Sequence, residues 1–221
     1  MQGKFITFEG GEGAGKSTQI ALLRQKLEQL GLSVLQTREP GGSTGAEAIR
    51  QVILSGQAKS FGPAGEALLF SAARIDHIDQ MIAPALKSGH WVLCDRFADS
   101  TRAYQGALGN LDTRVIRVLE TVTLNGLTPD LTLILDLSAE QGLARANTRR
   151  GHQAKADRFE AESLDFHRAL RSAFLDIATS EPERCIIVDA ARDIDTIARD
   201  IFWKVRERFH LGDKASAKGQ V

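Results

Sequence analysis

The sequence has few of the residues that bind metals or cross-link a chain. It contains two cysteines and five histidines among 221 residues. Cys94 and Cys185 lie far apart inside apolar segments and form no CxxC pair, and the histidines form no HExxH motif. This scarcity argues against a zinc site and predicts buried free thiols, which persist in a reducing compartment.

Long apolar segments and an excess of one charge are also absent. No apolar segment approaches the roughly 18 residues of a transmembrane helix, and the N-terminal segment lacks the pattern of a signal peptide. The 28 basic residues are balanced by 28 acidic ones, so the basic excess typical of nucleic-acid-binding proteins is missing. We therefore expect a cytoplasmic protein with no membrane or nucleic-acid partner, in which any strong anion site is a local cluster.

Five short apolar segments alternate with helical patterns along the chain. Each is almost continuously apolar, which is typical of parallel strands covered on both faces. The expected strands are Phe5–Glu9, Ser33–Thr37, Trp91–Asp95, Leu131–Asp136 and Cys185–Asp189. This order predicts an α/β fold of three layers, in which helices flank a five-stranded parallel sheet. We expect one domain over residues 1–210 and a disordered polar tail over residues 211–221.

Apolar residues at helical spacing mark three of the expected helices. The first of these helices ends at Gly31, and the second spans about Ala64 to Lys87. The stripes are Ile20, Leu23, Leu27 and Leu30; then Leu68, Ala72, Ile75, Ile82 and Leu86; and finally Ile194, Ile197, Ile201, Val205 and Phe209. We expect the first and third stripes to pack in the core, whereas the second could serve either the core or a contact between subunits.

The segment FEGGEGAGKST, residues 8–18, follows the first expected strand and opens a helix. Its GxxxxGKS spacing is that of a phosphate-binding loop, in which successive backbone N–H groups point at phosphate oxygens. In this motif the side chain of Lys16 contacts the β- and γ-phosphates, and the hydroxyl of Ser17 ligates Mg²⁺. The expected ATP-binding residues are Gly10, Gly11, Glu12, Gly13, Ala14, Gly15, Lys16, Ser17 and Thr18. Glu12 is unexpected, because it places a carboxylate inside an anion-binding loop.

The loop predicts nucleotide binding but leaves the fate of the nucleotide open. The DxxG and NKxD motifs of GTPases are absent from the sequence. A mechanical or regulatory ATPase would need only the loop, whereas a kinase also needs a basic site for a phosphoryl acceptor.

The segment DRFADSTRAYQG, residues 95–106, offers such an acceptor site at the end of the third expected strand. Ligands of parallel sheets bind beyond the carboxyl ends of the strands, and Arg96 could bind a phosphate through two hydrogen bonds. A polar surface loop with a local Asp95–Arg96 ion pair is the alternative. Three strands end in aspartate, and Asp95 is a better candidate for magnesium than Asp136 or Asp189 because it adjoins Arg96.

Two further segments could belong to the acceptor site. TREPGG, residues 37–42, places Arg38 after the second strand, although a solvated turn would have the same composition. FSAAR, residues 70–74, puts Phe70 and Arg74 on one helix face because they are four residues apart. That face could pack against another subunit, or it could offer a nucleobase a stacking ring and a planar hydrogen-bond donor.

A third basic cluster lies in RANTRRGHQAKADR, residues 145–158. A cluster of this kind is often only a solvated face. Phosphoryl transfer, however, is accelerated about 10³- to 10⁵-fold by an arginine over the transferring group, and closure of a lid excludes water. We therefore expect a catalytic lid over about residues 145–158, with Arg149, Arg150 and Arg158 as its candidate arginines.

In combination these motifs resemble those of bacterial thymidylate kinases. The resemblance extends from Phe5 to about Phe209, and it is carried by FEGGEGAGKST, TREPGG, FSAAR, DRFADSTRAYQG, PDLTLILD and DRFE. It implies a P-loop NTPase fold, a homodimer, and transfer of the γ-phosphoryl group of ATP-Mg²⁺ to dTMP. The products are then dTDP and ADP, a step of dTTP biosynthesis.

The resemblance also implies roles for individual residues in the acceptor site. Glu12 turns away from ATP, toward the 3′-hydroxyl of the acceptor's deoxyribose. Phe70 stacks on thymine, and Arg74 hydrogen-bonds the base. Arg38 and Arg96 bind the acceptor phosphate. The sugar and the rest of the base contact Tyr104, which crowds the 2′ position, and Ser100, Thr101 and Gln105.

The same resemblance bears on catalysis. Some relatives carry an arginine in the phosphate loop where this chain has Gly13, so the lid must supply the catalytic arginine here, with Arg149 or Arg150 the better placed candidates. The candidate catalytic residues are Lys16, Arg96, Arg149, Arg150 and Arg158. Phe97 replaces the tyrosine or histidine often found after the Asp-Arg pair, and nothing in the mechanism requires that polar group.

Two alternatives remain beside this reading. The acceptor could be another nucleoside monophosphate such as dUMP, because one methyl group is worth only about 1–3 kcal/mol in a pocket. The protein could instead be a nucleotide-binding ATPase without an acceptor, which would not need Phe70, Arg74 or Arg96.

Overall fold

Five parallel strands form the central sheet of the protein, in the order β2-β3-β1-β4-β5. The computed structural model describes residues 3–150, apart from the side chain of residue 150, and residues 158–212. The strands are β1 (Phe5–Glu9), β2 (Val34–Arg38), β3 (Trp91–Asp95), β4 (Leu131–Asp136) and β5 (Cys185–Asp189). Four expected strands are confirmed with the same bounds. The second lies one residue later, because β2 pairs with β3 as far as Arg38 opposite Asp95.

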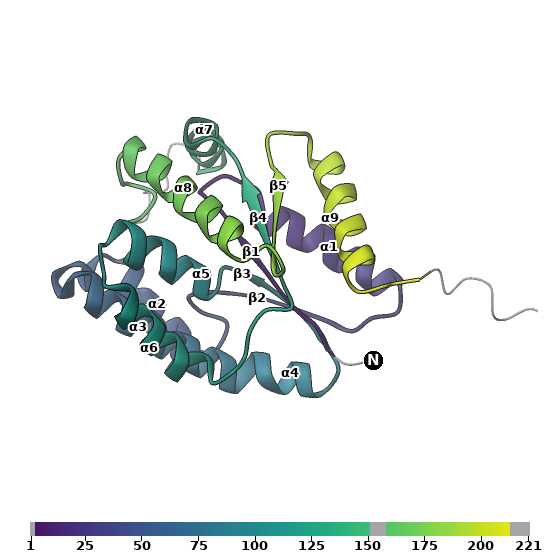
Figure 1. Ribbon diagram of the computed structural model, residues 1–221, viewed down its shortest axis with the longest axis horizontal. Helices are drawn as coiled ribbons and strands as arrows, with labels where there is room; N and C mark the ends of the chain where they lie inside the picture. Colours follow the sequence, from purple (N-terminus) through teal and green to yellow (C-terminus); the bar gives the residue numbers. More distant parts are fainter. Residues whose placement is uncertain (1–2, 151–157, 213–221) are drawn as a thin grey trace, which may run out of the picture.

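Helices cover both faces of this sheet and complete the expected three layers (Figure 1). α1 (Lys16–Gln29) and α9 (Ile194–Arg208) lie together on one face. α4 (Ala83–Lys87) and α8 (Leu164–Ser180) contact the opposite face. The other described helical elements are α2 (Thr44–Leu54), the 3₁₀ turn η1 (Gln57–Phe61), α3 (Gly62–His77), the π turn η2 (Ile78–Ile82), α5 (Ala98–Thr101), the π turn η3 (Arg102–Leu108), α6 (Thr113–Leu124) and α7 (Ala139–Arg150).

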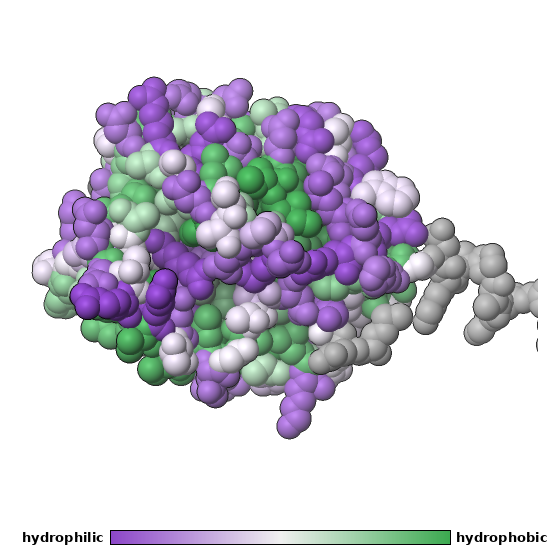
Figure 2. Space-filling model, in the orientation of Figure 1, coloured by the Kyte–Doolittle hydropathy of each residue, from purple (hydrophilic) through white to green (hydrophobic). Residues whose placement is uncertain are grey.

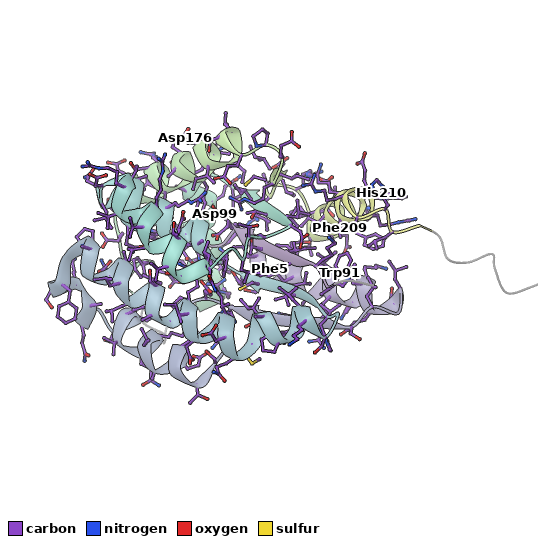
Figure 3. The ribbon with its side chains drawn as sticks, turned by 60° about the horizontal axis from the view of Figure 1, so that its bottom comes forward. Phe5, Trp91, Asp99, Asp176, Phe209 and His210 are labelled. Atoms are coloured by element: carbon purple, nitrogen blue, oxygen red, sulfur yellow. The ribbon has the colours of Figure 1, made fainter. Side chains whose placement is uncertain are left out.

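Alternate strand residues enter the two sides of the core. Ile6 and Phe8 belong to the cluster that contains the buried residues of α1 and α9. On that side the ring of Trp91 meets the ring of Phe209 edge-on, with centroids 5.0 Å apart (Figure 3). Phe5 faces the other side and meets the ring of Phe97 at 4.9 Å. Burial of both faces explains why β1, β3 and β4 are almost continuously apolar, whereas the edge strands β2 and β5 are only partly buried.

The long expected helix is present, but its apolar stripe does not enter the core as a unit. α3, η2 and α4 follow one another from residue 62 to residue 87. Leu68 and Ile75 are 58% and 38% exposed, whereas Ile82 is fully buried. A π turn carries more than 3.6 residues, so it rotates the residues that follow it relative to α3. The inward face of α3 instead carries buried polar residues, among them Arg74 and His77.

The other two stripes pack as expected except at the helix ends. Ile20, Leu23 and Leu27 are buried, as are Ile197, Ile201 and Val205, and Phe209 is partly buried. Leu30 and Ile194 are 48% and 57% exposed, because they lie at the ends of their helices where the chain leaves the sheet. Within the part of the chain that the structure describes, no helix has the length and hydropathy to cross a lipid bilayer.

Candidate functional site

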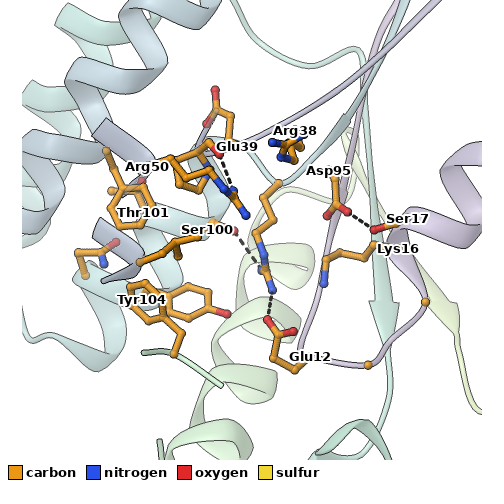
Figure 4. Close-up of a pocket in the computed structure, with 18 of the residues that line it drawn as sticks. Glu12, Lys16, Ser17, Arg38, Glu39, Arg50, Asp95, Ser100, Thr101 and Tyr104 are labelled. Atoms are coloured by element: carbon orange, nitrogen blue, oxygen red, sulfur yellow. Dashed lines mark hydrogen bonds and ion pairs between the residues drawn. The ribbon is translucent and has the colours of Figure 1, made fainter. Parts of the chain in front are cut away.

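Three loops meet at the carboxyl ends of neighbouring strands and enclose a cavity of about 460 Å³. They follow β1, β2 and β3, and they contain the phosphate loop, the TREPGG segment and the DRFADS segment. Figure 4 shows Ser17 and Asp95 at one end of this cavity and Ser100, Thr101 and Tyr104 at the other. The lining consists of Glu12, Gly13, Gly15, Lys16, Ser17, Thr18, Arg38, Glu39, Pro40, Arg50, Leu54, Phe70, Asp95, Arg96, Ser100, Thr101, Tyr104, Gln105, Arg149 and Phe159.

The phosphate loop ends where α1 begins, at Lys16. The Nζ atom of Lys16 donates hydrogen bonds to the carbonyl oxygens of Gly10 and Gly11, at 3.1 and 2.9 Å. Burial lowers the pKa of this ammonium group. The loop also packs closely on α7, since a Cβ atom at Gly13 would lie 2.0 Å from the carbonyl oxygen of Gly142. Gly13 also has a φ of 67°, so this position requires glycine for space and for conformation.

The structure brings the two predicted magnesium ligands together. The hydroxyl of Ser17 donates a hydrogen bond of 2.7 Å to Oδ2 of Asp95. Asp136 is held by two hydrogen bonds from Arg171, at 2.6 and 2.8 Å, and Asp189 accepts one from a backbone N–H. Mg²⁺ binds oxygen ligands and keeps several waters, so a hydroxyl and a carboxylate beside bound phosphates suit it. Among the described residues, no group of three or more His, Cys, Asp or Glu side chains could hold a metal.

Glu12 projects toward the acceptor end of the cavity, where it meets Arg96. The Nη2 atom of Arg96 donates to Oε1 of Glu12 at 2.9 Å, and Nη1 donates to the carbonyl oxygen of Gly10 at 3.1 Å. Burial would raise the pKa of Glu12, but the charges of Arg96 and Lys16 outweigh it and lower the pKa to about 2. Glu12 is therefore ionised at neutral pH, and its charge is balanced by the guanidinium group.

Glu9 fixes the backbone of the loop that carries Arg96, and sequence reasoning did not find it. Its carboxylate is fully buried and accepts hydrogen bonds of 2.7 Å from the backbone N–H of Phe97 and from the hydroxyl of Ser100. Burial and the nearby charge of Asp99 raise the pKa of Glu9 to about 7. Arg96 has a φ of 69°, a left-handed conformation that non-glycine residues rarely adopt. The bonds to Glu9 hold the chain on the C-terminal side of this strained residue.

Aromatic rings form the far end of the cavity. The ring of Phe159 lies edge-on to Tyr104 with centroids 5.2 Å apart, and its centroid is 6.2 Å from that of Phe70. The guanidinium carbon of Arg96 lies 5.4 Å from the centroid of Tyr104. Gln105 completes this end of the lining. Such a pocket can hold a flat apolar ring and orient it with a few polar groups.

The two other predicted acceptor arginines lie in different surroundings. Arg38 lines the cavity, with its side chain 54% exposed, and pairs with Glu47 at 2.8 Å. Arg74 is 3% exposed and lies behind the lining, where its Nε atom donates to Glu39 at 2.7 Å. Its Nη2 atom donates to the carbonyl oxygen of Phe97 at 3.1 Å. Arg74 thus ties the second and third loops together in this structure, and its contact with a base stays a prediction.

The predicted lid is described in part. Arg149 lines the cavity and pairs with Glu160 at 3.3 Å. The side chain of Arg150 and residues 151–157 lie outside the described residues. Arg158 is absent from the cavity lining, and it forms an ion pair with Glu66 of α3 instead. Of the two candidate lid arginines whose side chains the structure describes, Arg149 lines the cavity and Arg158 does not, and a catalytic role for Arg149 stays a prediction.

Comparison with known proteins identifies the family. A family model described as "Thymidylate kinase" matches residues 8–201. The chain belongs to the thymidylate kinase family. A protein of Nitrobacter hamburgensis named thymidylate kinase is 53% identical over 216 residues, which cover 98% of this chain and 94% of that protein. A thymidylate kinase of Rhodopseudomonas palustris is 55% identical over 219 residues, which cover 99% and 95% of the two chains.

Several lining residues of this thymidylate kinase family member were missed by sequence reasoning. They are Pro40, Arg50, Leu54 and Phe159. Pro40 belongs to TREPGG and Phe159 to DRFE, so the motifs themselves were the available signal. Arg50 lies outside these motifs. Its Nη1 atom donates to the carbonyl oxygen of Pro40 at 2.6 Å, and this contact depends on the path of the turn that follows Pro40, which no sequence pattern indicates.

Proposed function

We propose that this protein transfers the γ-phosphoryl group of ATP-Mg²⁺ to the phosphate of dTMP, giving dTDP and ADP. One observation carries the proposal: a single cavity joins a phosphate loop to a second basic, aromatic-lined end. A nucleotide hydrolase would need only the first of these ends. Both relatives described above are named thymidylate kinases, which supports dTMP as the acceptor.

The chain needs no nucleophile of its own, because an oxygen of the acceptor phosphate attacks the γ-phosphorus. Catalysis then consists of alignment and of neutralising charge on the transferring group. We assign this neutralisation to Lys16 and Arg149 at the donor and to Arg96 at the acceptor, with Arg150 as a further candidate. Ser17 and Asp95 would hold Mg²⁺ here, and the ion would supply positive charge that balances the charge of the phosphates.

The acceptor site is assigned from the same geometry. Phe70 would stack on thymine, while Thr101 and Gln105 border the base. Arg96 would bind the acceptor phosphate together with Arg38, whose Nη2 atom pairs with Glu47 in this structure. Glu12 would accept a hydrogen bond from the 3′-hydroxyl. The remaining contacts, to the sugar and the phosphate, are assigned to Tyr104 and Ser100.

A homodimer is the proposed assembly. α3 and α6 lie side by side, and both present apolar side chains to solvent. The exposed apolar residues of the two helices are Leu68, Ile75, Val115, Val118 and Val122. Figure 2 shows hydrophobic residues along the lower left edge of the molecule, where Figure 1 places these helices. A second copy of the chain would cover them, and Val118→Arg should convert a dimer to a monomer in analytical ultracentrifugation.

We further propose a single kinase domain over residues 1–210, with its lid near residues 145–158, acting in the cytoplasm. The two cysteines, Cys94 and Cys185, are both buried and unpaired. Free buried thiols fit a reducing compartment.

Initial rates of ADP formation test the acceptor. ATP-Mg²⁺ is offered with dTMP, dUMP, UMP, CMP, AMP or GMP at equal concentration. A strong preference for dTMP is the expected result. Faster turnover of another monophosphate would keep the kinase and overturn the assignment of the base, and equal ADP formation without any acceptor would indicate an ATPase.

A further inference from the structure

A second, smaller cavity of about 90 Å³ lies beside the aromatic end of the main one. Tyr104, Gln105 and Phe159 border both cavities, so they form the partition between them. Glu66 and Arg158 line only the smaller cavity. These two charged residues therefore lie directly behind the wall of the pocket that we assign to the base.

The carboxylate of Glu66 is buried, and a buried charge needs a partner of opposite charge. Glu66 is 4% exposed and lies one helical turn before Phe70 on α3. Arg158 supplies the opposite charge, and its own side chain is 17% exposed. The Nε2 atom of Gln105 also approaches Glu66, at 3.4 Å. Moving Arg158 into the main cavity would leave a buried, unpaired carboxylate, which is strongly unfavourable.

Arg158 in turn holds the neighbouring aromatic ring. Its guanidinium carbon lies 4.5 Å from the ring centroid of Phe159. On the side of the main cavity, that ring contacts Tyr104 and lies near Phe70, as described above. The guanidinium group that pairs with Glu66 therefore also makes a cation–π contact with the ring of Phe159.

We propose that Glu66 and Arg158 are positioning residues whose buried ion pair holds Phe159 as a wall of the nucleobase pocket, next to Phe70. Phe159 then determines specificity by contacting the pyrimidine ring, and Arg158 makes no contact with the transferring phosphoryl group. The inference rests on the proposed function, because the ring in question is the base of the acceptor. It revises the prediction from sequence that made Arg158 a candidate for catalysis.

Binding of thymidine and of dTMP separates the two roles. Thymidine has the base and lacks the phosphate, so a residue that acts on the base affects both ligands equally. We expect Arg158→Ala, Glu66→Gln and Phe159→Ala each to lower the affinity for thymidine and for dTMP about tenfold, which is within the range known for base–aromatic contacts. The KM for ATP-Mg²⁺ should stay within about twofold. The Glu66→Gln/Arg158→Ala double variant should be no worse than the poorer single variant, since both changes break one interaction.

Arg168→Ala is the matched control, because it removes an arginine–glutamate pair whose side chains are 56% and 50% exposed. It should leave the affinity for both ligands unchanged. Phe159→Leu keeps the ion pair between Glu66 and Arg158 intact. It therefore tests the role of the aromatic ring even where the Glu66 or Arg158 variants fail to fold. We expect this variant to have a lower affinity for thymidine as well.

Two results would overturn the inference in an enzyme that phosphorylates dTMP. One is an Arg158→Ala variant whose kcat falls 100-fold or more while its affinity for thymidine is unchanged. The other is an unchanged affinity for thymidine in Phe159→Leu. If the unmodified enzyme does not phosphorylate dTMP at all, the proposed function fails, and this inference fails with it.

Discussion

The two ends of the cavity are built by different means. At the donor end, residues 10–17 form a continuous loop, and Lys16 bonds to carbonyl oxygens only five and six residues away. At the acceptor end, side chains from separate segments converge. They are held by carboxylates that pair with arginines: Glu12 with Arg96, Glu39 with Arg74, and Glu66 with Arg158.

This difference follows from what each end must recognise. Phosphates are recognised by backbone N–H groups and a helix N-terminus, which a short glycine-rich segment provides by itself. A base and a sugar need groups of defined shape on several sides, so the chain must bring distant residues together. Buried ion pairs hold these residues in place, and removing one partner leaves an uncompensated charge.

The strongest test of the donor end is removal of its arginines. Arg149→Ala combined with Arg150→Ala should lower kcat about 10³-fold or more, because the transition-state charge loses its partner. Steady-state kinetics with saturating dTMP measure this loss. Arg199→Ala, which removes an exposed arginine of α9, is the control. An unchanged kcat in the double variant would contradict the hypothesis that the lid supplies a catalytic arginine.

Removal of Arg96 tests the acceptor end and should have the next largest effect. Arg96→Ala takes away the partner of Glu12 and the proposed phosphate ligand. We expect the KM for dTMP to rise about 30-fold or more, since truncating one partner of a buried charge pair costs about 2–5 kcal/mol. The KM for ATP-Mg²⁺ should change much less. An unchanged KM for dTMP would show that Arg96 does not serve the acceptor.

The pH dependence of stability compares two carboxylates within one motif. The pKa of Glu9 is raised from 4.5 to about 7, so the folded state retains a proton that the unfolded state loses first. Stability from this group is therefore full below pH 4.5 and is lost as pH rises to about 7, by up to about 3 kcal/mol. Glu12, with its pKa lowered to about 2, has the opposite pH dependence: its stabilising contribution is full above about pH 4.5 and is lost as pH falls toward 2.

Glu9→Gln removes this dependence. Urea unfolding at pH 5 and pH 7.5 should show a smaller decrease in unfolding free energy for Glu9→Gln than for the unmodified protein. All other titrating groups are common to both proteins, so the difference isolates Glu9. Equal decreases in the two proteins would contradict the raised pKa.

The smallest effect is expected at the exposed charge pair of the acceptor end. Glu47→Gln weakens the pair with Arg38, whose side chains are 39% and 54% exposed. Exposed pairs contribute about 0–1 kcal/mol, so the unfolding free energy should change by less than about 1 kcal/mol. The KM for dTMP should stay within about threefold. A loss as large as that of Arg96→Ala would contradict the distinction between buried and exposed pairs.

The donor end could be predicted from sequence because its contacts are local. The GxxxxGKS spacing defines the loop, and the meeting of Ser17 with Asp95 follows from the rule that parallel strands share a carboxyl edge. Four of the five strands were found for a similar reason, since each is a short, almost continuous apolar segment, whereas β2 carries only two apolar residues, Val34 and Leu35.

The supporting residues of the acceptor end could not be predicted in this way. Arg74 turned toward Glu39, 35 residues earlier in the chain, and no pattern in the sequence indicates that choice. The π turn after α3 also changed which apolar residues face the core. Glu66 did carry a signal, because it precedes Phe70 and Arg74 at intervals of four residues on one helix face.

In the function that we propose, both ends of the cavity act in one reaction. The decisive experiment measures dTDP and ADP together, in the presence and absence of dTMP, after mixing the protein with ATP-Mg²⁺. We expect equal amounts of dTDP and ADP with dTMP, and very little ADP without it. ADP formed at the same rate without dTMP, or ADP in large excess over dTDP, would indicate a nucleotide hydrolase instead of a kinase.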